Sequence, residues 1–207
     1  QFAGFPSSQI NRSNTKSYAA YLKLTQKFSD QISLTGGLRY NWDKIGWNQN
    51  LLFDPSKGWY GTNNFGVGGF QWALSSSQGT LVGDASLQYR PDANAMVYLS
   101  YTRGYKPAAY NTAHSFAVAQ AAVKATDADF GFVNPTKKES IDSFEIGAKI
   151  TALDGHLTFN ADAFYTNYAD YQAQLFDNTQ LVGVLVLSSA GARTAGIEAD
   201  VNFRQGN

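Results

Sequence analysis

The feature that most constrains the fold is a strict alternation of apolar and polar residues in two long segments. In Ile32–Asp43 the even positions are apolar or glycine, and the odd positions are polar, charged or glycine. Leu157–Gln172 repeats the pattern, with exceptions at Phe164, Asn167 and Tyr168. Because successive side chains of a β-strand point to opposite faces of its sheet, each segment is predicted to be a strand with one apolar and one polar face.

Weaker versions of the same alternation bring the number of predicted strands to seven. The expected strands are residues 18–28, 32–45, 80–90, 95–106, 139–151, 157–177 and 184–204. The connections at 29–31, 91–94 and 153–156 carry the Asp, Asn, Pro and Gly residues of tight turns, and so predict hairpins. The sequence therefore predicts an all-β fold, an antiparallel up-and-down meander.

Two long connections, about residues 45–80 and 106–138, alternate with the short turns. Both exceed the roughly 12–15 residues beyond which structureless loops are uncommon in compact domains, and such loops usually carry function. The second contains the Ala-rich segment 116–125, in which we expect a short helix. Strands joined alternately by short turns and long loops are typical of transmembrane barrels.

An antiparallel meander with one apolar face has two possible surroundings. In a soluble sandwich the apolar face packs on a second sheet, whereas in a transmembrane barrel it contacts lipid and the polar face lines the lumen. Aromatic residues at both ends of the apolar faces favour the barrel, with Phe28 and Tyr89 near short turns and Trp42 and Tyr101 near long connections. Charged residues make up 15% of the chain, below the roughly 25% usual in soluble domains, which agrees with a lipid-facing surface.

Composition argues against several other functions. Lys plus Arg (16) balances Asp plus Glu (16), so the excess positive charge that nucleic acid requires is absent. The chain has no Cys, and His114 and His156 are its only histidines, which leaves little for a zinc site or a His-based catalytic group. We therefore expect no enzyme activity, no cofactor, no bound metal and no nucleic-acid partner.

Five segments resemble the barrel of TonB-dependent outer-membrane receptors. They are SLTGGLRY at 33–40, YLSYTRGYKPAAYN at 98–111, ESIDSFEIGAK at 139–149, LTFNADAFYTNYADYQ at 157–172 and SAGARTAGIEAD at 189–200. The segments follow the order and spacing of the family, and the similarity covers residues 18–204. The set is what carries the resemblance, since no single segment would suffice.

The resemblance implies active import of a nutrient across the bacterial outer membrane, most often a ferric siderophore. Receptors of this family have a barrel of about 22 strands, closed by an N-terminal plug domain and coupled to the TonB protein. Seven strands without a plug are expected to be an interior section of such a barrel, roughly a third of it. The expected partners are outer-membrane lipid, the plug, the remaining strands, TonB and the ligand. Vitamin B12, haem and oligosaccharide remain open as ligands, and a passive porin-like barrel or a soluble carbohydrate-binding sandwich remain alternatives.

In this family the ligand is captured by aromatic and polar side chains of the extracellular loops and the upper lumen. The candidates in this chain are Trp47, Trp59, Tyr60, Phe65, Trp72, Arg103, Tyr105, Lys106, Tyr110, Asn111 and His114. The aromatic residues either stack on ligand or pack on one another, and the cations either attract an anionic chelate or solvate strand ends.

The alternation also predicts a set of ionisable residues that face the lumen. They are Arg39, Asp43, Asp84, Glu145, Lys149, Asp162, Asp170, Glu198, Asp200 and Arg204. Ionisable groups at membrane depth normally face the interior and pair there. We therefore expect these groups to pair across strands or with the plug.

Overall fold

The computed structural model describes residues 8–52, 70–110, 135–177 and 184–205, most of which lie in strands. The strands are β1 (Ser8–Lys27), β2 (Ile32–Leu52), β3 (Phe70–Asp92), β4 (Ala95–Lys106), β5 (Glu139–Ala152), β6 (Leu157–Asp177) and β7 (Val184–Phe203). A turn of 3-10 helix, η2 (Leu153–Gly155), lies between β5 and β6. None of the described segments forms a helix with the length and apolar character needed to cross a membrane. The helix expected at 116–125 falls outside the described residues.

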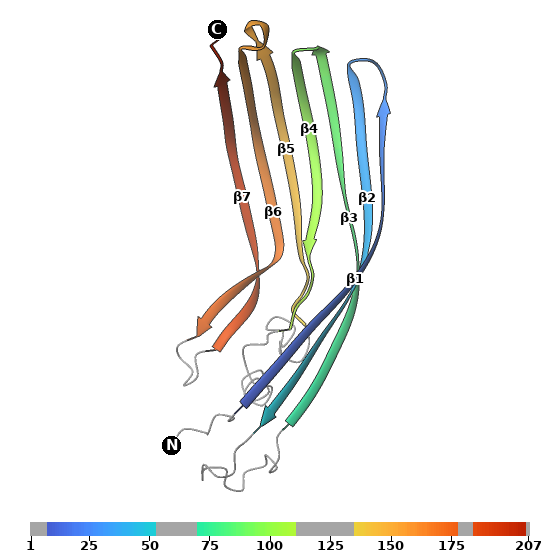
Figure 1. Ribbon diagram of the computed structural model, residues 1–207, viewed down its shortest axis with the longest axis vertical. Helices are drawn as coiled ribbons and strands as arrows, with labels where there is room; N and C mark the ends of the chain where they lie inside the picture. Colours follow the sequence, from blue (N-terminus) through green and yellow to red (C-terminus); the bar gives the residue numbers. More distant parts are fainter. Residues whose placement is uncertain (1–7, 53–69, 111–134, 178–183, 206–207) are drawn as a thin grey trace.

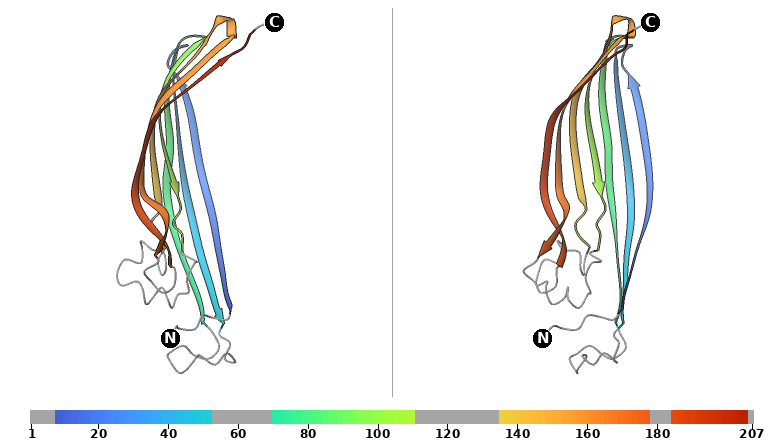
Figure 2. Two further views of the ribbon diagram at one scale, coloured as in Figure 1. Left: turned by 90° about the vertical axis from the view of Figure 1, so that its left-hand side faces the viewer. Right: turned by 60° about the vertical axis from the view of Figure 1, so that its left-hand side comes forward.

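Each strand pairs with the strand that follows it in the chain. The order within the sheet is β1-β2-β3-β4-β5-β6-β7, and every pairing is antiparallel. The short turns lie together at one end of the sheet, at the top of Figure 1. The sheet is curved rather than flat, like a section of a barrel wall (Figure 2). The predicted antiparallel meander is therefore confirmed.

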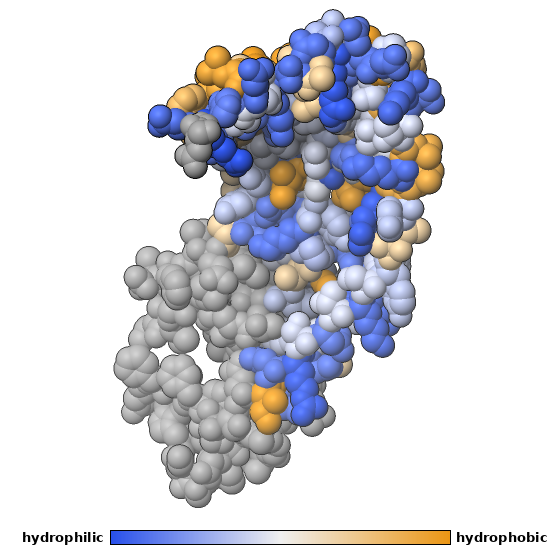
Figure 3. Space-filling view, turned by 45° about the horizontal axis from the view of Figure 1, so that its top comes forward, coloured by the Kyte–Doolittle hydropathy of each residue, from blue (hydrophilic) through white to orange (hydrophobic). Residues whose placement is uncertain are grey.

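The register assigns the side chains to two faces, which we call the polar face and the apolar face. On β2 the odd positions belong to the polar face, and the even positions, which include Trp42, belong to the apolar face. Directly opposite residues share a face: Tyr18 lies opposite Trp42, with ring centroids 5.8 Å apart, and Tyr101 lies opposite Phe144 at 4.9 Å. In Figure 3, hydrophobic side chains gather toward the margins of the molecule, while hydrophilic side chains cover the surface between them.

The apolar face is a band of large hydrophobic side chains that the described protein leaves uncovered. Of the described hydrophobic residues only Ile45, Trp47 and Ala108 are buried, whereas 26 large ones are exposed. The accessible surface is 13890 Å², compared with about 9500 Å² for a compact protein of this mass. A water-soluble sandwich would cover this face with a second sheet, but the described strands form one sheet.

The height of the apolar band can be estimated on β2, where it runs from Ile32 to Trp42. At about 3.3 Å per residue this segment is about 33 Å long, or about 23 Å along the membrane normal for a strand tilted by about 45°. Transmembrane barrels carry an apolar band about 25 Å tall. The exposed face therefore has the dimensions of a surface that contacts lipid.

Strands β1, β2 and β3 extend beyond their predicted bounds at the end of the sheet away from the short turns. Strand β1 begins at Ser8 rather than at residue 18, and β2 ends at Leu52 rather than at residue 45. Strand β3 begins at Phe70 rather than at residue 80. The expected loop at 45–80 is therefore largely strand, and Trp47 and Trp72 lie in β2 and β3. The other four strands differ from the prediction by one residue at most.

The extension was not predicted because the hydrophobic pattern reverses beyond the apolar band, on the side away from the short turns. Between the short turn and this point the apolar residues of β2 are on the apolar face. Beyond it, Ile45 and Trp47 are buried on the polar face. Lys44 lies on the same side of the sheet as the apolar face, at a position that corresponds to those of hydrophobic residues nearer the short turns. A search for alternation that expects apolar residues on one face no longer detects the strand where the surroundings change from lipid to water.

The short turns are closed by local hydrogen bonds that fix the register of each hairpin. Ser29 Oγ accepts from the backbone N–H groups of Gln31 (3.2 Å) and Ile32 (3.0 Å). Asp92 Oδ1 accepts from the N–H of Asn94 (2.7 Å). Such side-chain bonds to the following backbone are typical of Asp and Ser in turns. Because a slip of one residue would exchange the two faces, these turns support the separation of polar from apolar side chains.

Candidate functional site

The carboxylate of Asp43, on the polar face of β2, is almost completely enclosed, with 1% of the residue exposed. Ser17 Oγ on β1 donates to Asp43 Oδ1 (2.6 Å), and the hydroxyl of Tyr105 on β4 donates to Oδ2 (2.6 Å). Strand β4 pairs with β3 only as far as Gly83 and Arg103, so the end of β4 is free to lie over the polar face of β2. Both carboxylate oxygens thus have charge-assisted hydrogen bonds, as a buried carboxylate requires.

Two of the predicted aromatic residues meet further along the polar face of β2. Trp47 is on the same face of β2, four residues further along, and is 1% exposed. Its ring lies against that of Tyr110, with centroids 6.1 Å apart and planes inclined by 26°. Tyr110 belongs to the segment that follows β4. An aromatic pair and a buried carboxylate therefore share the polar face of β2, about 13 Å apart along the strand, where the lumen of a barrel would open.

Three buried nitrogen donors in this region have no hydrogen-bond partner among the described residues. They are Asn41 Nδ2, Trp47 Nε1 and Gln78 Nε2. Gln78 on β3 lies directly opposite Asp43, and Asn41 is the preceding polar-face residue of β2. The Asn41 amide oxygen is used, since Arg39 Nε donates to it (2.7 Å). Buried donors are normally satisfied, so these three mark a place where an oxygen-rich partner would be stabilised.

The segments that border the connection between β4 and β5 hold each other in place over this cluster. The N–H of Thr136 donates to the carbonyl of Ala109 (2.8 Å), and Thr136 Oγ1 accepts from the N–H of Ala109 (3.1 Å). Lys138 Nζ donates to the carbonyl of Gly79 and to Oγ1 of Thr80, both at 3.2 Å. The base of this connection is therefore attached to the wall at β3.

A buried glutamine on β6 attaches the same segments from the other side. Gln172 Nε2 donates to the carbonyls of Pro107 (3.1 Å) and Lys137 (2.9 Å), and its backbone N–H donates to Glu139 Oε2 (3.0 Å). Gln172 follows a bulge in β6, where Asp170 has a positive φ of 54°. The base of the loop thus links β2 and β3 to β6 across the polar face.

Nearer the short turns, the polar face carries a second set of ionisable groups. Tyr98 on β4 donates to Glu145 Oε1 on β5 (2.5 Å), and Lys149 Nζ lies 6.0 Å from the Tyr98 ring centroid. Asp162 on β6 lies directly opposite Glu198 on β7, and no ion pair joins either of them to another described residue. The pairing expected across strands is therefore met by tyrosine hydroxyls at some positions and unmet at others.

The structure brings some predicted site residues together and separates others. Tyr105 contacts Asp43, and Tyr110 contacts Trp47, on the polar face of β2. Arg103 lies on the apolar face beside Asp142 (3.8 Å) and is separated from them, and Lys106 is exposed at the end of β4. Trp72, on β3, lies opposite Gln49 of β2. The candidates outside the described residues are Trp59, Tyr60, Phe65, Asn111 and His114.

The predicted lumen-facing residues lie mostly where the alternation expects them. By register the polar face carries Arg39, Asp43, Asp84, Glu145, Lys149, Asp162, Glu198 and Asp200. Asp84 pairs with Lys23 (3.0 Å). Asp170, at the bulge, lies 3.7 Å from Lys137, and Arg204 follows the end of β7. That these faces line a lumen stays a prediction.

Comparison with known proteins shows which family this architecture belongs to. A family model described as TonB dependent receptor-like, beta-barrel, matches residues 2–207. The chain belongs to this family. The resemblance found in the sequence is therefore confirmed, and the TonB-dependent receptor barrel explains why one face of the sheet is apolar and uncovered.

Curated relatives of this TonB-dependent receptor barrel are pesticin receptors. The receptor of Yersinia enterocolitica is 28% identical over 200 residues, and that of Yersinia pestis is 27% identical over 200 residues. In each case the alignment covers 95% of this chain and 25% of the receptor. The chain thus spans about a quarter of the length of these relatives. They are receptors rather than enzymes.

Solved structures of the same fold include two ferric receptors. The ferric yersiniabactin uptake receptor FyuA of Yersinia pestis has a TM-score of 0.69 at 22% identity, covering 95% of this chain and 25% of that receptor. The closed form of the ferric-catecholate import receptor Fiu of E. coli has a TM-score of 0.63 at 20% identity, covering 92% and 26%. At these identities the likeness shows the fold alone.

Sequence reasoning missed several residues that build the site of this TonB-dependent receptor barrel. Gln78 and Gln172 are polar residues of strands, and Gln78 falls in a segment predicted to be a loop. Asn41 had the stronger signal, because it alternates with Tyr40 and Trp42. Ser17 preceded the first predicted strand. The described residues contain no group of three or more His, Asp or Glu side chains placed to hold a metal ion.

Proposed function

We propose that this chain is a section of the barrel of an outer-membrane receptor that imports a ferric siderophore by TonB-dependent active transport. The observation that carries the proposal is on the polar face, where Trp47 and Tyr110 stack and three buried nitrogen donors, one of them Trp47 Nε1, have no partner among the described residues. The family membership and the ferric ligands named for FyuA and Fiu support it.

The chemistry of the cluster suits a ligand rich in oxygen acceptors and flat rings. Asn41, Trp47 and Gln78 each offer an N–H group, and such groups are best satisfied by carboxylate, phenolate or carbonyl oxygens. The rings of Trp47 and Tyr110 offer surfaces for stacking on an aromatic chelator. A ferric catecholate or phenolate chelate combines both features, which is why we favour it over vitamin B12, haem or oligosaccharide.

The proposal includes the partners that such transport requires. Lipid of the outer membrane would contact the apolar face, and a plug domain would face the polar side. The remaining barrel strands would pair with the outer edges of β1 and β7, which have no partner among the described strands. Energy would come from TonB. The carboxylates of Asp162 and Glu198, close together on the polar face, are positions where plug cations would be stabilised.

The ligand part of the proposal can be tested with the complete receptor that contains this chain. Binding of ferric yersiniabactin, a ferric catecholate and heme would be titrated by tryptophan fluorescence in detergent. We expect one ferric chelate to bind. We expect Trp47→Leu to weaken it about tenfold, the equivalent of about 1.4 kcal/mol, because it removes both a ring and a donor.

A matched control and a transport assay complete this test. Trp42→Leu makes the same change on the apolar face of the same strand and should leave ligand binding unchanged. Uptake of radioactive iron in cells should require TonB, whereas a passive porin-like barrel would transport equally well without it. Equal loss of binding in both variants, or iron uptake independent of TonB, would contradict the proposal.

A further inference from the structure

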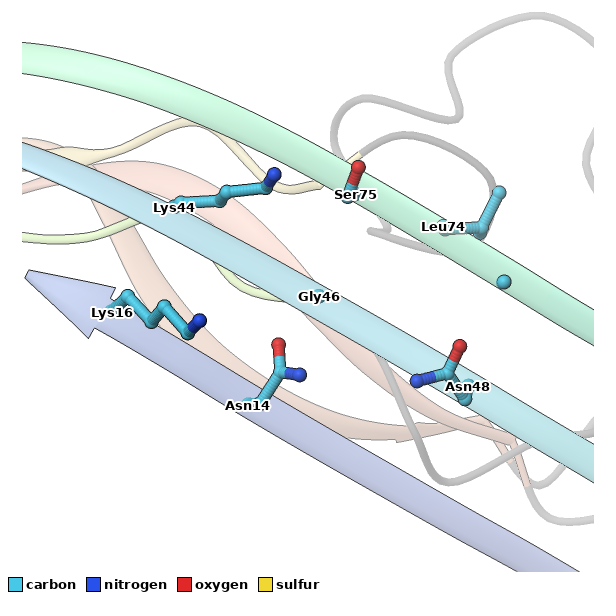
Figure 4. Close-up of a pocket in the computed structure, with 8 residues that line it drawn as sticks. Asn14, Lys16, Lys44, Gly46, Asn48, Leu74 and Ser75 are labelled. Atoms are coloured by element: carbon cyan, nitrogen blue, oxygen red, sulfur yellow. The ribbon is translucent and has the colours of Figure 1, made fainter.

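The extended part of β1–β3 carries a basic surface on its outward side, the side that continues the apolar face away from the short turns. We call it the outer lysine patch, formed by Lys16, Lys44, Asn14, Asn48 and Ser75 around Gly46. These residues surround a depression of about 300 Å³, and Figure 4 shows them on three neighbouring strands. Gly46 also lines it, and a Cβ atom at this position would collide with the side-chain amide of Asn14.

The two lysines occupy directly opposite positions on neighbouring strands. Lys16 pairs with Lys44 in the register of β1 and β2, and both side chains are exposed. Like charges directly opposite each other are unfavourable, since their Cβ atoms are only about 4.5–5.5 Å apart. Neither lysine forms a hydrogen bond or ion pair with any other described residue. The pair therefore has unbalanced positive charge.

The rest of the outward surface on the extended strands offers no counter-charge. Its charged members by register are Arg12, Lys16 and Lys44, and the other described side chains, which include the exposed Ile10, are uncharged. Asp43, the nearest carboxylate in sequence, points to the polar face and accepts from Ser17 and Tyr105. A bound anion would relieve the repulsion.

Another cation on the outward side of the wall, nearer the short turns, is arranged differently. On β4 and β5, Arg103 lies next to Asp142 (3.8 Å), which also accepts from the hydroxyl of Tyr101 (2.6 Å). The positive charge there is balanced within the protein. The contrast shows that an outward-facing cation of this wall can have a counter-charge within the protein, which Lys16 and Lys44 lack among the described residues.

The depth of the patch indicates which anion it meets. Each lysine lies two residues from Tyr18 or Trp42 on the same strand, on the side away from the short turns. Tyr18 and Trp42 are aromatic residues of the kind that mark the membrane interface. Two residues along a strand is about 7 Å, or about 5 Å along the membrane normal at a tilt of about 45°. This level is that of lipid headgroups, which carry phosphate.

We propose that the outer lysine patch binds the phosphate of an outer-leaflet lipid headgroup. Lys16 and Lys44 supply the charge, and Asn14, Asn48 and Ser75 supply further hydrogen-bond donors around the same depression. The acyl chains then continue along the apolar face past Tyr18 and Trp42. The inference rests on the proposed membrane location, but it concerns a different face from the ligand cluster.

The proposal can be tested by native mass spectrometry of the complete receptor in detergent. Dioleoyl phosphatidic acid would be compared with dioleoylglycerol, which has the same chains and no phosphate. We expect Lys16→Gln and Lys44→Gln each to weaken phosphatidic acid about fivefold, and the double variant about 25-fold, corresponding to about 1 kcal/mol for each lysine. Dioleoylglycerol should bind all variants equally.

The control is Lys23→Gln, which removes a positive charge from the polar face of the same strand and should leave lipid binding unchanged. Equal loss in Lys23→Gln, or no loss in the double variant, would overturn the proposal. Displacement of the lipid by equimolar inorganic phosphate would also overturn it, because the site would then be one for free anions. Iron uptake tests the proposed function separately. Normal uptake in the double variant leaves the proposed function intact. Loss of uptake in a receptor whose lipid binding is unchanged would count against the proposed function and not against the lipid site.

Discussion

Three tyrosines of β4, Tyr98, Tyr101 and Tyr105, each donate a hydrogen bond to a carboxylate of a neighbouring part of the sheet, at 2.5–2.6 Å. The tyrosine side chain is long enough for its hydroxyl to reach a carboxylate on another strand, whereas Ser and Thr side chains are shorter. The tyrosine hydroxyl is also neutral, so it adds no charge that would need a partner. Carboxylates at membrane depth can therefore be held without Lys or Arg at every position. At these three positions a neutral hydroxyl donor stabilises a charged acceptor.

The strength of these bonds should follow the burial of the carboxylate. We expect Tyr105→Phe to lower the free energy of unfolding by about 2 kcal/mol, because Asp43 is 1% exposed and would keep only the bond from Ser17. Tyr101→Phe should cost less than about 1 kcal/mol, because the Asp142 side chain is 26% exposed to solvent and has Arg103 beside it. Urea unfolding of the two variants of the complete receptor measures both values, and equal costs would refute the role of burial.

Close contact between an aromatic ring and a glycine is a second feature at this scale. A Cβ atom on Gly147 would lie 2.5 Å from the hydroxyl oxygen of Tyr98 and 2.6 Å from its Cζ, so the ring covers the glycine. We expect Gly147→Ala to displace the ring, break its bond to Glu145 and cost about 1–3 kcal/mol. Gly104→Ala is the control on β4, since nothing lies within 4 Å of its Cβ position. Thermal unfolding that ranks Gly104→Ala as the worse change would contradict this packing.

At the scale of single elements, each strand of the wall separates two environments. Leu99 and Ser100 are adjacent on β4, yet Leu99 is on the apolar face with 54% exposure, and Ser100 is on the polar face opposite Glu145. A strand of this kind is stable only when its two faces meet lipid and the polar interior respectively. The same substitution should therefore have very different costs at neighbouring positions.

Arginine is the substitution that best separates the two faces. We expect Leu99→Arg to destabilise the receptor by about 2–4 kcal/mol, since its charge would lie near the middle of the apolar band. Ser100→Arg should cost less than about 1 kcal/mol, because Glu145 lies opposite and can pair with it. Refolding into phosphatidylcholine vesicles from urea gives both values. A similar cost for the two variants would mean that β4 does not face lipid.

The sequence predicted elements well where one physical environment covers a whole strand. β4 and β6 have their predicted bounds, because their apolar positions keep one face from end to end or nearly so. β1 was predicted ten residues too short, since Ser8–Ser17 contains almost no apolar residue and so gives no period. Pairing with β2 forms that part of the strand, and pairing is a property of two segments that a single periodicity does not show.

The candidate site was predictable only in its parts. Asp43 and Trp47 could be identified as polar-face and aromatic candidates separately, but the contact of Tyr105 with Asp43 depends on where β4 leaves β3. Likewise the bulge at Asp170 shifts the alternation, so the position of Gln172 did not follow from its parity. Local pattern gives the face of a residue, whereas strand separation and bulges determine which residues of distant strands meet.

At the scale of the whole molecule, the sheet has two open edges, at β1 and at β7. The backbone N–H and C=O groups of an edge strand that point away from the sheet have no partner in it. The excess of accessible surface, 13890 Å² against about 9500 Å², has the same origin, since neither the edges nor the apolar face is covered. Two open edges and an uncovered apolar face are the features that we predict for a part of a closed barrel wall.

Hydrogen exchange can distinguish a part of a closed wall from an independent sheet. In the complete receptor we expect the amides of 18–27 on β1 and 195–203 on β7 to exchange as slowly as those of central β4, because further strands would pair with both edges. In residues 1–207 refolded alone into detergent, the outward amides of β1 and β7 should exchange at least tenfold faster than those of β4. Strand β4 is the internal control, since it has two neighbours in both samples. If the edges of the isolated chain were as protected as β4, the sheet would have to close on itself, and the barrel-section assignment would be wrong.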